Sequence, residues 1–147
     1  MTLRIGALGA ARITPAALVK PAREVDGVEV VAVAARDRER AAKFAAKHGI
    51  ARVVDSYDAL IDDPGIDAIY NPLPNGLHGV WTTRALEAGK HVLCEKPFTA
   101  NAAEAEAVAA TSRASPEPSV RGHLASAPGR PFASARSAPP GSLLPPS

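Results

Sequence analysis

Residues 3–14 read LRIGALGAARIT, an apolar run followed by small residues. The apolar run 3–8 predicts a buried strand, and the small residues after it predict a tight turn into a helix. The dinucleotide-binding fingerprint G-x-G-x-x-G stands at such a junction, where its glycines form the turn, admit a pyrophosphate and pack helix on strand. Gly9, Ala11 and Thr14 occupy its three glycine places here. With two glycines replaced, a dinucleotide site and a plain strand-to-helix turn are equally compatible with this segment.

The rest of the chain as far as residue 111 repeats the same pattern of a strand followed by a helix. Short apolar runs alternate with longer alanine-containing stretches, which predicts strand-helix units and a parallel sheet covered on both faces. The further strands are predicted at 28–35, 52–54, 67–71 and 91–95, and helices at 38–48, 77–88 and 101–111. Pro21 lies inside the first helix, so we expect a break or kink near Lys20.

The composition fits one domain of ordinary size. With 147 residues the chain has room for one domain and a tail. Its single cysteine excludes an intrachain disulfide and a cysteine-cluster metal site, which favours a reducing, cytoplasmic setting. No segment resembles a signal peptide or approaches the roughly 18 to 20 apolar residues of a membrane span. We expect a soluble cytoplasmic protein that holds no metal and does not enter a membrane.

The end of the second predicted strand carries the signal for the cofactor. NAD enzymes place an Asp or Glu there to bind the adenosine ribose, whereas an Arg there can hold the 2'-phosphate of NADP. The strand ends here in Ala34, Ala35, Arg36 and Asp37. A small residue followed by Arg36 favours NADP over NAD, through a charge-assisted contact to the phosphate. The alternative is that Arg36 is a solvated residue and that Asp37 only caps the following helix.

A loop with two prolines follows the strand predicted at 67–71, and Asn75 and His78 come just after it. In open α/β sheets ligands bind outside the carboxyl ends of the strands, so this loop should border the cofactor. Taken alone, Asn75 is better explained as a helix N-cap, and a lone histidine is more often structural than catalytic.

The last predicted strand ends in Cys94, Glu95, Lys96 and Pro97. Cys94 is expected to be a small buried strand residue. Glu95, Lys96 and Pro97 stand at the same rim of the sheet as the proline-containing loop. Pro97 ends the strand, so that Lys96 can face a pocket.

Together these units resemble the amino-terminal domain of the Gfo/Idh/MocA family, named for glucose-fructose oxidoreductase, inositol dehydrogenase and rhizopine catabolism. The resemblance covers residues 3 to about 111 without a gap. It is carried, in order, by GALGAARI, VAVAARDRERAAKFAAKHGI, YDALIDDPGIDAIYNPLPNGLHGVWTTRALEAGKHVLCEKPF and TANAAEAEAVA. The family implies a Rossmann-like, doubly wound parallel α/β sheet of about five strands. It also implies an oxidoreductase that moves a hydride to or from a hydroxyl or carbonyl group of a sugar, polyol or dihydrodiol.

The resemblance also implies a role for each matching residue. Gly9, Ala10, Ala11, Arg12 and Ile13 would form the pyrophosphate loop, and Arg36 would hold the 2'-phosphate of NADP, with NAD as the alternative cofactor. Pro72, Leu73, Asn75, His78, Glu95, Lys96 and Pro97 would line the path to the nicotinamide and the substrate. Lys96 occupies the place of the family's catalytic lysine, and an ammonium beside a sugar hydroxyl or carbonyl can polarise it or share its proton.

The sequence changes character after Thr111. Residues 112–147 include eight prolines and eight serines, and no helix or strand period is recognisable in them. Such a segment cannot bury enough apolar area to offset an ordering cost of about 1 to 2 kcal/mol per residue. We expect a Rossmann domain over 1–111 and a disordered tail over 112–147. Single scattered arginines and one aromatic residue, Phe132, make binding of nucleic acid by the tail the weaker alternative.

Members of the family continue into a sixth strand and a second α/β domain that forms the substrate pocket, and the sequence matches neither. The Ala, Pro, Arg, Ser and Gly content of the tail suggests a frame-shifted reading of a GC-rich gene, which translation of the coding DNA in the other two frames would test. Loss of the sixth strand would expose a sheet edge and favour self-association. A sugar-like substrate would bind only if a second domain is supplied.

Three interpretations stay open. The first is an oxidoreductase by descent whose chain is truncated and inactive alone. The second is a stand-alone NADP-binding or regulatory module without catalysis. The third is an interaction protein that works through its tail.

Overall fold

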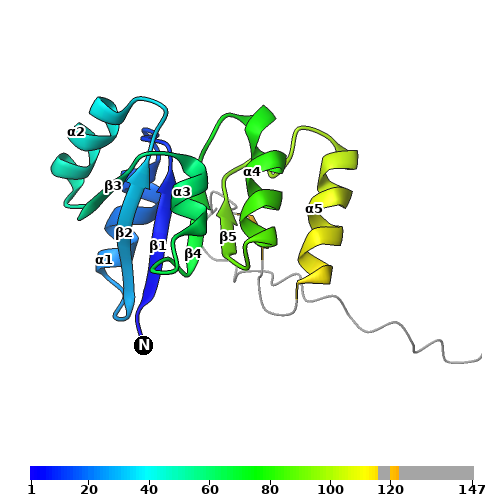
Figure 1. The fold of residues 1–147 in the computed structure, drawn as a ribbon, viewed down its shortest axis with the longest axis horizontal. Helices are drawn as coiled ribbons and strands as arrows, with labels where there is room; N and C mark the ends of the chain where they lie inside the picture. The colour runs from blue at the N-terminus through cyan, green and yellow to red at the C-terminus, as the bar shows by residue number, and fades with distance from the viewer. Residues whose placement is uncertain (116–119, 123–147) are drawn as a thin grey trace, which may run out of the picture.

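The computed structural model describes residues 1–115 and 120–122, which form one parallel sheet with helices on both faces (Figure 1). The strands are β1 Leu3–Leu8, β2 Val28–Ala34, β3 Arg52–Val54, β4 Ala68–Asn71, β5 His91–Cys94 and β6 Val120–Gly122. Their order is β3-β2-β1-β4-β5-β6, and every neighbouring pair is parallel. This is the strand order of a doubly wound dinucleotide-binding fold, so the predicted fold class is confirmed.

The helices divide between the two faces of the sheet. They are η1 Pro15–Val19 (a π-helical turn), α1 Lys20–Arg23, α2 Arg38–His48, α3 Tyr57–Asp62, α4 Asn75–Glu87 and α5 Ala102–Ala114. On one face α3, α4 and α5 contribute Leu60, Leu86 and Val108 to the core (Figure 1). On the other face η1 and α2 contribute Leu18, Val19 and Ala45. Burial on both faces explains why the strands read as continuous runs of Val, Ile, Leu and Ala.

Local signals in the sequence set several helix ends. The Asp37 side chain accepts a hydrogen bond from the N–H of Arg40, and Gly49 takes the left-handed conformation (φ 66°) that ends α2, as predicted for 38–48. Asn101 caps α5 through the N–H of Glu104 in the same way. The helical run that contains Pro21 changes from π to α hydrogen bonding at Lys20, the point of the expected break, while its backbone stays right-handed.

Three features differ from the sequence analysis. The short helix α3 was not predicted, although Ser56 caps it through the N–H of Ala59. Helix α5 continues past Thr111 to Ala114. Asn75 is not a helix cap, because α4 begins at Asn75 itself, Pro74 holds the N-cap position, and no side chain caps this end.

The expectation that the sixth strand is missing was wrong. Val120–Gly122 forms β6 and pairs with β5, with Val120 opposite Val92 and Gly122 opposite Cys94. The open edge of β5 supplies the backbone hydrogen bonds that favour such pairing. Three residues are too few to show the alternation by which a strand is recognised in a sequence. The rest of the expected tail, 116–119 and 123–147, lies outside the described residues.

The strand order also fixes where a ligand can bind. Strand β1 pairs with β2 on one side and with β4 on the other, so the chain leaves β1 and β4 toward opposite faces of the sheet. Such a switch point opens a crevice at the carboxyl ends of the strands. The centre of β1 is tightly packed, since a Cβ at Gly6 would lie 3.0 Å from Ile66 Cδ1 and 3.1 Å from Leu60 Cγ.

Candidate dinucleotide-binding site

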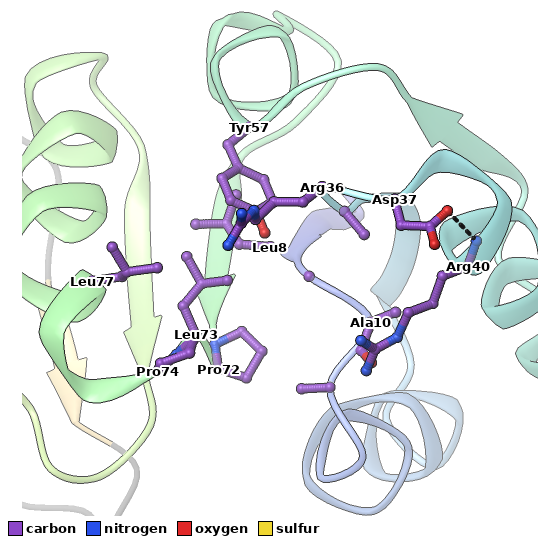
Figure 2. A pocket seen from close by; sticks show the side chains of 13 residues that line it. Leu8, Ala10, Arg36, Asp37, Arg40, Tyr57, Pro72, Leu73, Pro74 and Leu77 are labelled. Atoms are coloured by element: carbon purple, nitrogen blue, oxygen red, sulfur yellow. Dashed lines mark hydrogen bonds between the residues drawn. The ribbon is translucent and has the colours of Figure 1, made fainter.

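A cleft of about 720 Å³ lies at this switch point. Three wall segments form it, each following a different strand: Gly9 to Ala11 after β1, Ala35 to Arg40 after β2, and Pro72 to Leu77 after β4 (Figure 2). Tyr57 at the start of α3 adds an aromatic side chain. A crevice at the carboxyl ends of parallel strands, between the first and fourth, is where doubly wound folds bind dinucleotides.

The turn after β1 has small residues that let a ligand approach its backbone closely. Gly9 has φ 76°, and a Cβ on it would lie 3.1 Å from Leu73 Cδ2, so a side chain there would be strained and would crowd the opposite wall. Its N–H donates to the carbonyl of Ala34, which ties the turn to the end of β2. Ala11 keeps the second glycine place small, and Thr14 at the third place is fully buried against the core.

This turn presents unused hydrogen-bond donors. Among the described residues, the N–H groups of Ala10, Ala11, Arg12 and Ile13 donate to no protein acceptor. Successive free N–H groups before a helix form a concavity that suits a phosphate group. The residues present therefore fit a pyrophosphate. Arg12 and Ile13 are exposed and do not line the cleft itself, whereas Gly9, Ala10 and Ala11 do.

Two guanidinium groups stand at the β2 end of the cleft. Arg36 stands two residues after the end of β2, and Arg40 lies in the first turn of α2, from where its Nη2 donates to the carbonyl oxygen of Ala10 at 3.1 Å. Asp37, the acidic residue that lines the cleft, accepts from the N–H of Arg40 at 3.1 Å and so serves as the helix cap (Figure 2). Arg40 was missed by the sequence analysis, although the predicted Asp37 cap places Arg40 in the first turn of α2, close to the end of β2.

Tyr57 was also missed. Its half-buried ring packs edge-on against Trp81, with 5.0 Å between the ring centroids, and its hydroxyl end faces the cleft. Burial raises the pKa of Tyr57, and the positive charges of Arg36 and Arg40 act against that rise. The side chain thus forms a neutral, flat surface beside the guanidinium group of Arg36, whereas that of Arg40 lies by Ala10 (Figure 2).

The wall after β4 is mostly apolar. Pro72, Leu73, Pro74 and Leu77 line it, of which Pro72 and Leu73 were predicted. Asn75 is exposed and does not line the cleft. His78 is buried inside α4, where its Nδ1 is hydrogen bonded to the carbonyl oxygen of Pro97 while its Nε2 has no partner among the described residues. His78 therefore ties α4 to the segment after β5 rather than lining the cleft.

The segment after β5 forms a second group of the predicted residues. Glu95 is 7% exposed and accepts a hydrogen bond of 2.5 Å from the hydroxyl of Tyr70 on β4. Lys96 and Pro97, joined by a cis peptide bond, are exposed. Cys94 is fully buried, as predicted, and burial raises the pKa of its thiol to about 11. A thiol in that state is not a nucleophile at neutral pH.

Within residues 1–115 and 120–122, no group of three or more His, Cys, Asp or Glu side chains is arranged to hold a metal ion. In the same part of the chain, no helix is both long and apolar enough to span a membrane.

Comparisons with known proteins agree with this geometry. Residues 3–119 match the profile of an oxidoreductase family, Gfo/Idh/MocA, described as having an NAD-binding Rossmann fold. The chain is 45% identical over 106 residues to the NADP-dependent D-xylose 1-dehydrogenase 2 of Haloferax volcanii, which covers 72% of this chain and 32% of that protein. It is 47% identical over 116 residues to the dTDP-3,4-didehydro-2,6-dideoxy-alpha-D-glucose 3-reductase of Streptomyces antibioticus, covering 76% of this chain and 34% of the reductase.

A solved structure gives the same result. A mutant 3-ketoreductase from Actinomadura kijaniata, in complex with TDP-benzene and NADP, superposes with a TM-score of 0.76 at 36% identity. The match covers 83% of this chain and 37% of the ketoreductase. The chain thus spans about a third of the length of the relatives it matches.

Proposed function

Because the chain belongs to the Gfo/Idh/MocA oxidoreductase family, we propose that it binds NADP in the cleft between β1, β2 and β4. We further propose that it serves hydride transfer to or from a hydroxyl or carbonyl group of a sugar, polyol or dihydrodiol. The observation that carries the cofactor preference is the pair of guanidinium groups, Arg36 and Arg40, at the end of the cleft where the adenosine ribose would lie.

The pyrophosphate would lie against the turn after β1. Free N–H groups at residues 10–13 are donors for its oxygens, and Gly9 and Ala11 leave room for them. Placed there, the adenosine half would extend toward β2 and the nicotinamide half toward Pro72 and Leu73.

The adenosine end favours a 2'-phosphate over a free 2'-hydroxyl. In NAD enzymes of this fold a carboxylate accepts from the ribose hydroxyl, and Asp37, the acidic residue that lines the cleft, already accepts from the N–H of Arg40 through Oδ1 as the cap of α2. A phosphate needs cations, and Arg36 and Arg40 supply two. The NADP-dependent D-xylose 1-dehydrogenase and the ketoreductase solved in complex with NADP support the same choice.

Lys96 is proposed as the catalytic residue of the chain. The bound dinucleotide would supply the hydride-transfer chemistry. Lys96 stands at the rim of the sheet next to Glu95, and its ammonium group is exposed to a substrate approaching from that side. A lysine there can polarise a carbonyl oxygen or share the proton of a hydroxyl group. Glu95 is held by Tyr70, so its part is to keep this segment in place.

The test is a titration of the 147-residue chain with NADPH and, separately, with NADH, following nicotinamide fluorescence. We expect NADPH to bind about 10- to 100-fold more tightly, because charge-assisted hydrogen bonds to the 2'-phosphate are absent with NADH. The Arg36→Ala variant should lose about tenfold in affinity for NADPH and keep its affinity for NADH.

Arg38→Ala is the matched control. Arg38 lies on the same helix start, but it forms an ion pair with Asp55 and does not line the cleft. Its replacement should leave both affinities unchanged. Equal affinity for NADH and NADPH would contradict the NADP preference, and a chain that is folded by circular dichroism yet binds neither would contradict the function.

A further inference from the structure

Asn71 is a polar residue in the core that the cleft itself does not explain. It ends β4, is completely buried, and contributes no surface to the cleft. A buried amide is costly unless its hydrogen bonds are made, so its partners indicate what it does.

The side chain of Asn71 holds three backbone and side-chain groups at once. Its Oδ1 accepts from the N–H of Leu73 at 3.3 Å. Its Nδ2 donates to the carbonyl oxygen of His78 at 3.3 Å and to Thr82 Oγ1 at 3.1 Å. The loop after β4 and the first two turns of α4 are thereby fixed to the end of the strand.

The loop depends on this side chain more than an ordinary loop would. Pro72 and Pro74 have no N–H group, which leaves Leu73 with the one backbone donor of the three residues. That donor goes to Asn71 Oδ1, in the manner of an Asx-turn. Leu73 Cδ2 is the atom that a Cβ on Gly9 would meet first, at 3.1 Å, so the position of Leu73 affects the width of the cleft at this point.

The backbone of Asn71 reaches the second group of site residues. Its carbonyl oxygen accepts from the N–H of Glu95 at 3.0 Å, immediately before Lys96. His78, whose carbonyl Asn71 holds, is hydrogen bonded in turn to the carbonyl of Pro97. Asn71 therefore connects the apolar wall of the cleft with the segment that carries Lys96.

We propose that Asn71 is a positioning residue that sets the nicotinamide side of the cleft, while having no part in binding the adenosine side. The proposal rests on the proposed function, since it requires a dinucleotide whose nicotinamide half lies against Leu73 and Leu77. If Asn71 had a purely structural role, it would support the fold as a whole. Its replacement would then weaken binding in both halves of the cleft equally.

The experiment compares two probes on the full 147-residue chain. NADPH contacts both halves of the cleft, whereas adenosine 2',5'-bisphosphate occupies only the adenosine half. The Asn71→Leu variant removes all three side-chain hydrogen bonds while keeping the branching and the number of heavy atoms of the side chain. We expect it to bind NADPH about tenfold more weakly and to bind adenosine 2',5'-bisphosphate as the unmodified chain does.

A milder variant keeps the test decisive if Asn71→Leu fails to fold. Thr82→Val deletes one partner of Asn71 Nδ2 and keeps the shape of the side chain at position 82. We expect about a threefold loss of affinity for NADPH and no loss for adenosine 2',5'-bisphosphate. Thr83→Val is its matched control, because Thr83 neighbours Thr82 on α4 and makes no side-chain hydrogen bond within the described part of the chain.

The outcomes separate the two proposals. If the unmodified chain binds neither probe, the proposed function fails, and the inference with it. If the unmodified chain binds both probes, and the Asn71→Leu and Thr82→Val variants lose affinity for NADPH but not for adenosine 2',5'-bisphosphate, the inference holds. Equal losses for both probes, or no loss for either, would overturn the positioning role while leaving the NADP-binding function intact.

Discussion

At the scale of single residues, the hydrogen bond between Tyr70 and Glu95 joins the central strand β4 to the segment that carries Lys96. Tyr70 is fully buried, and Glu95 nearly so. Burial, followed by the nearby Glu95 carboxylate, raises the pKa of Tyr70 far above its usual range, so the hydroxyl remains a donor throughout the neutral range.

We predict that Tyr70→Phe lowers the free energy of unfolding by about 1 to 3 kcal/mol at pH 7, because Glu95 loses its donor in a buried place. Urea denaturation followed by circular dichroism measures this. Tyr57→Phe is the comparison, since the hydroxyl of Tyr57 lies at the cleft, where water can replace its hydrogen bond to the backbone of Arg36, and its loss of stability should be smaller. Equal effects of the two substitutions would contradict the prediction.

The residues of the site show where sequence reasoning ends. Gly9, Arg36 and Leu73 could be placed at the cleft because each follows a strand that the sequence reveals. The partnership of Tyr70 with Glu95 could not be predicted, since 25 residues separate them and only the strand pairing brings them together. The motif predicted His78 at the site, but in the structure its side chain is buried and hydrogen bonded to the carbonyl oxygen of Pro97.

At the scale of elements, an ion pair joins the starts of the two central strands. Arg4 on β1 donates from its N–H, Nε and Nη2 to the carboxylate of Asp67, which directly precedes β4, at distances of 2.9 to 3.0 Å. The hydrogen bond from Arg4 is the main cause that lowers the pKa of Asp67 below its ordinary value of 3.8.

A lowered pKa makes the stabilising effect of Asp67 depend on pH. The effect is fully present above the ordinary value of 3.8 and is lost as the pH falls through the lower folded-state pKa. We predict that Asp67→Asn lowers the urea midpoint at pH 7 and that its difference from the unmodified chain shrinks at pH values below 3.8. Asp26→Asn removes an exposed carboxylate without an ion pair in the described structure and should change neither midpoint. A difference for Asp67→Asn that is constant down to pH 2 would be evidence against the ion pair.

Element boundaries could be predicted where a cap or a glycine marks them. Helix α2 matches the predicted 38–48 because Asp37 and Gly49 bracket it. Helix α3 has only six residues, too few for a helical period, and β6 has three. Both form because larger neighbours offer them a surface: α3 covers β1 and β2, and β6 completes the edge of β5. Such tertiary causes leave little local trace in a sequence, and for α3 that trace is the cap residue Ser56.

At the scale of the whole molecule, the cleft is a product of the topology. Its walls come from segments around residues 9, 36 and 73, which no local pattern places together, and the strand order brings all three to one edge of the sheet. Any event that separates β1 from β4 must destroy the cleft. Binding of the dinucleotide should therefore be linked to folding of the complete sheet.

This linkage gives a quantitative prediction. A ligand that binds only the folded chain raises the free energy of unfolding by about 2.7 kcal/mol when its free concentration is 100 times the dissociation constant. NADPH at that excess should raise the free energy of unfolding of the unmodified chain, measured by urea denaturation, by this amount. At the same concentration Arg36→Ala, with tenfold weaker binding, should gain only about 1.4 kcal/mol. If NADPH binds but unfolding is not shifted, part of the cleft persists in the unfolded state, and the topology is not what forms the site.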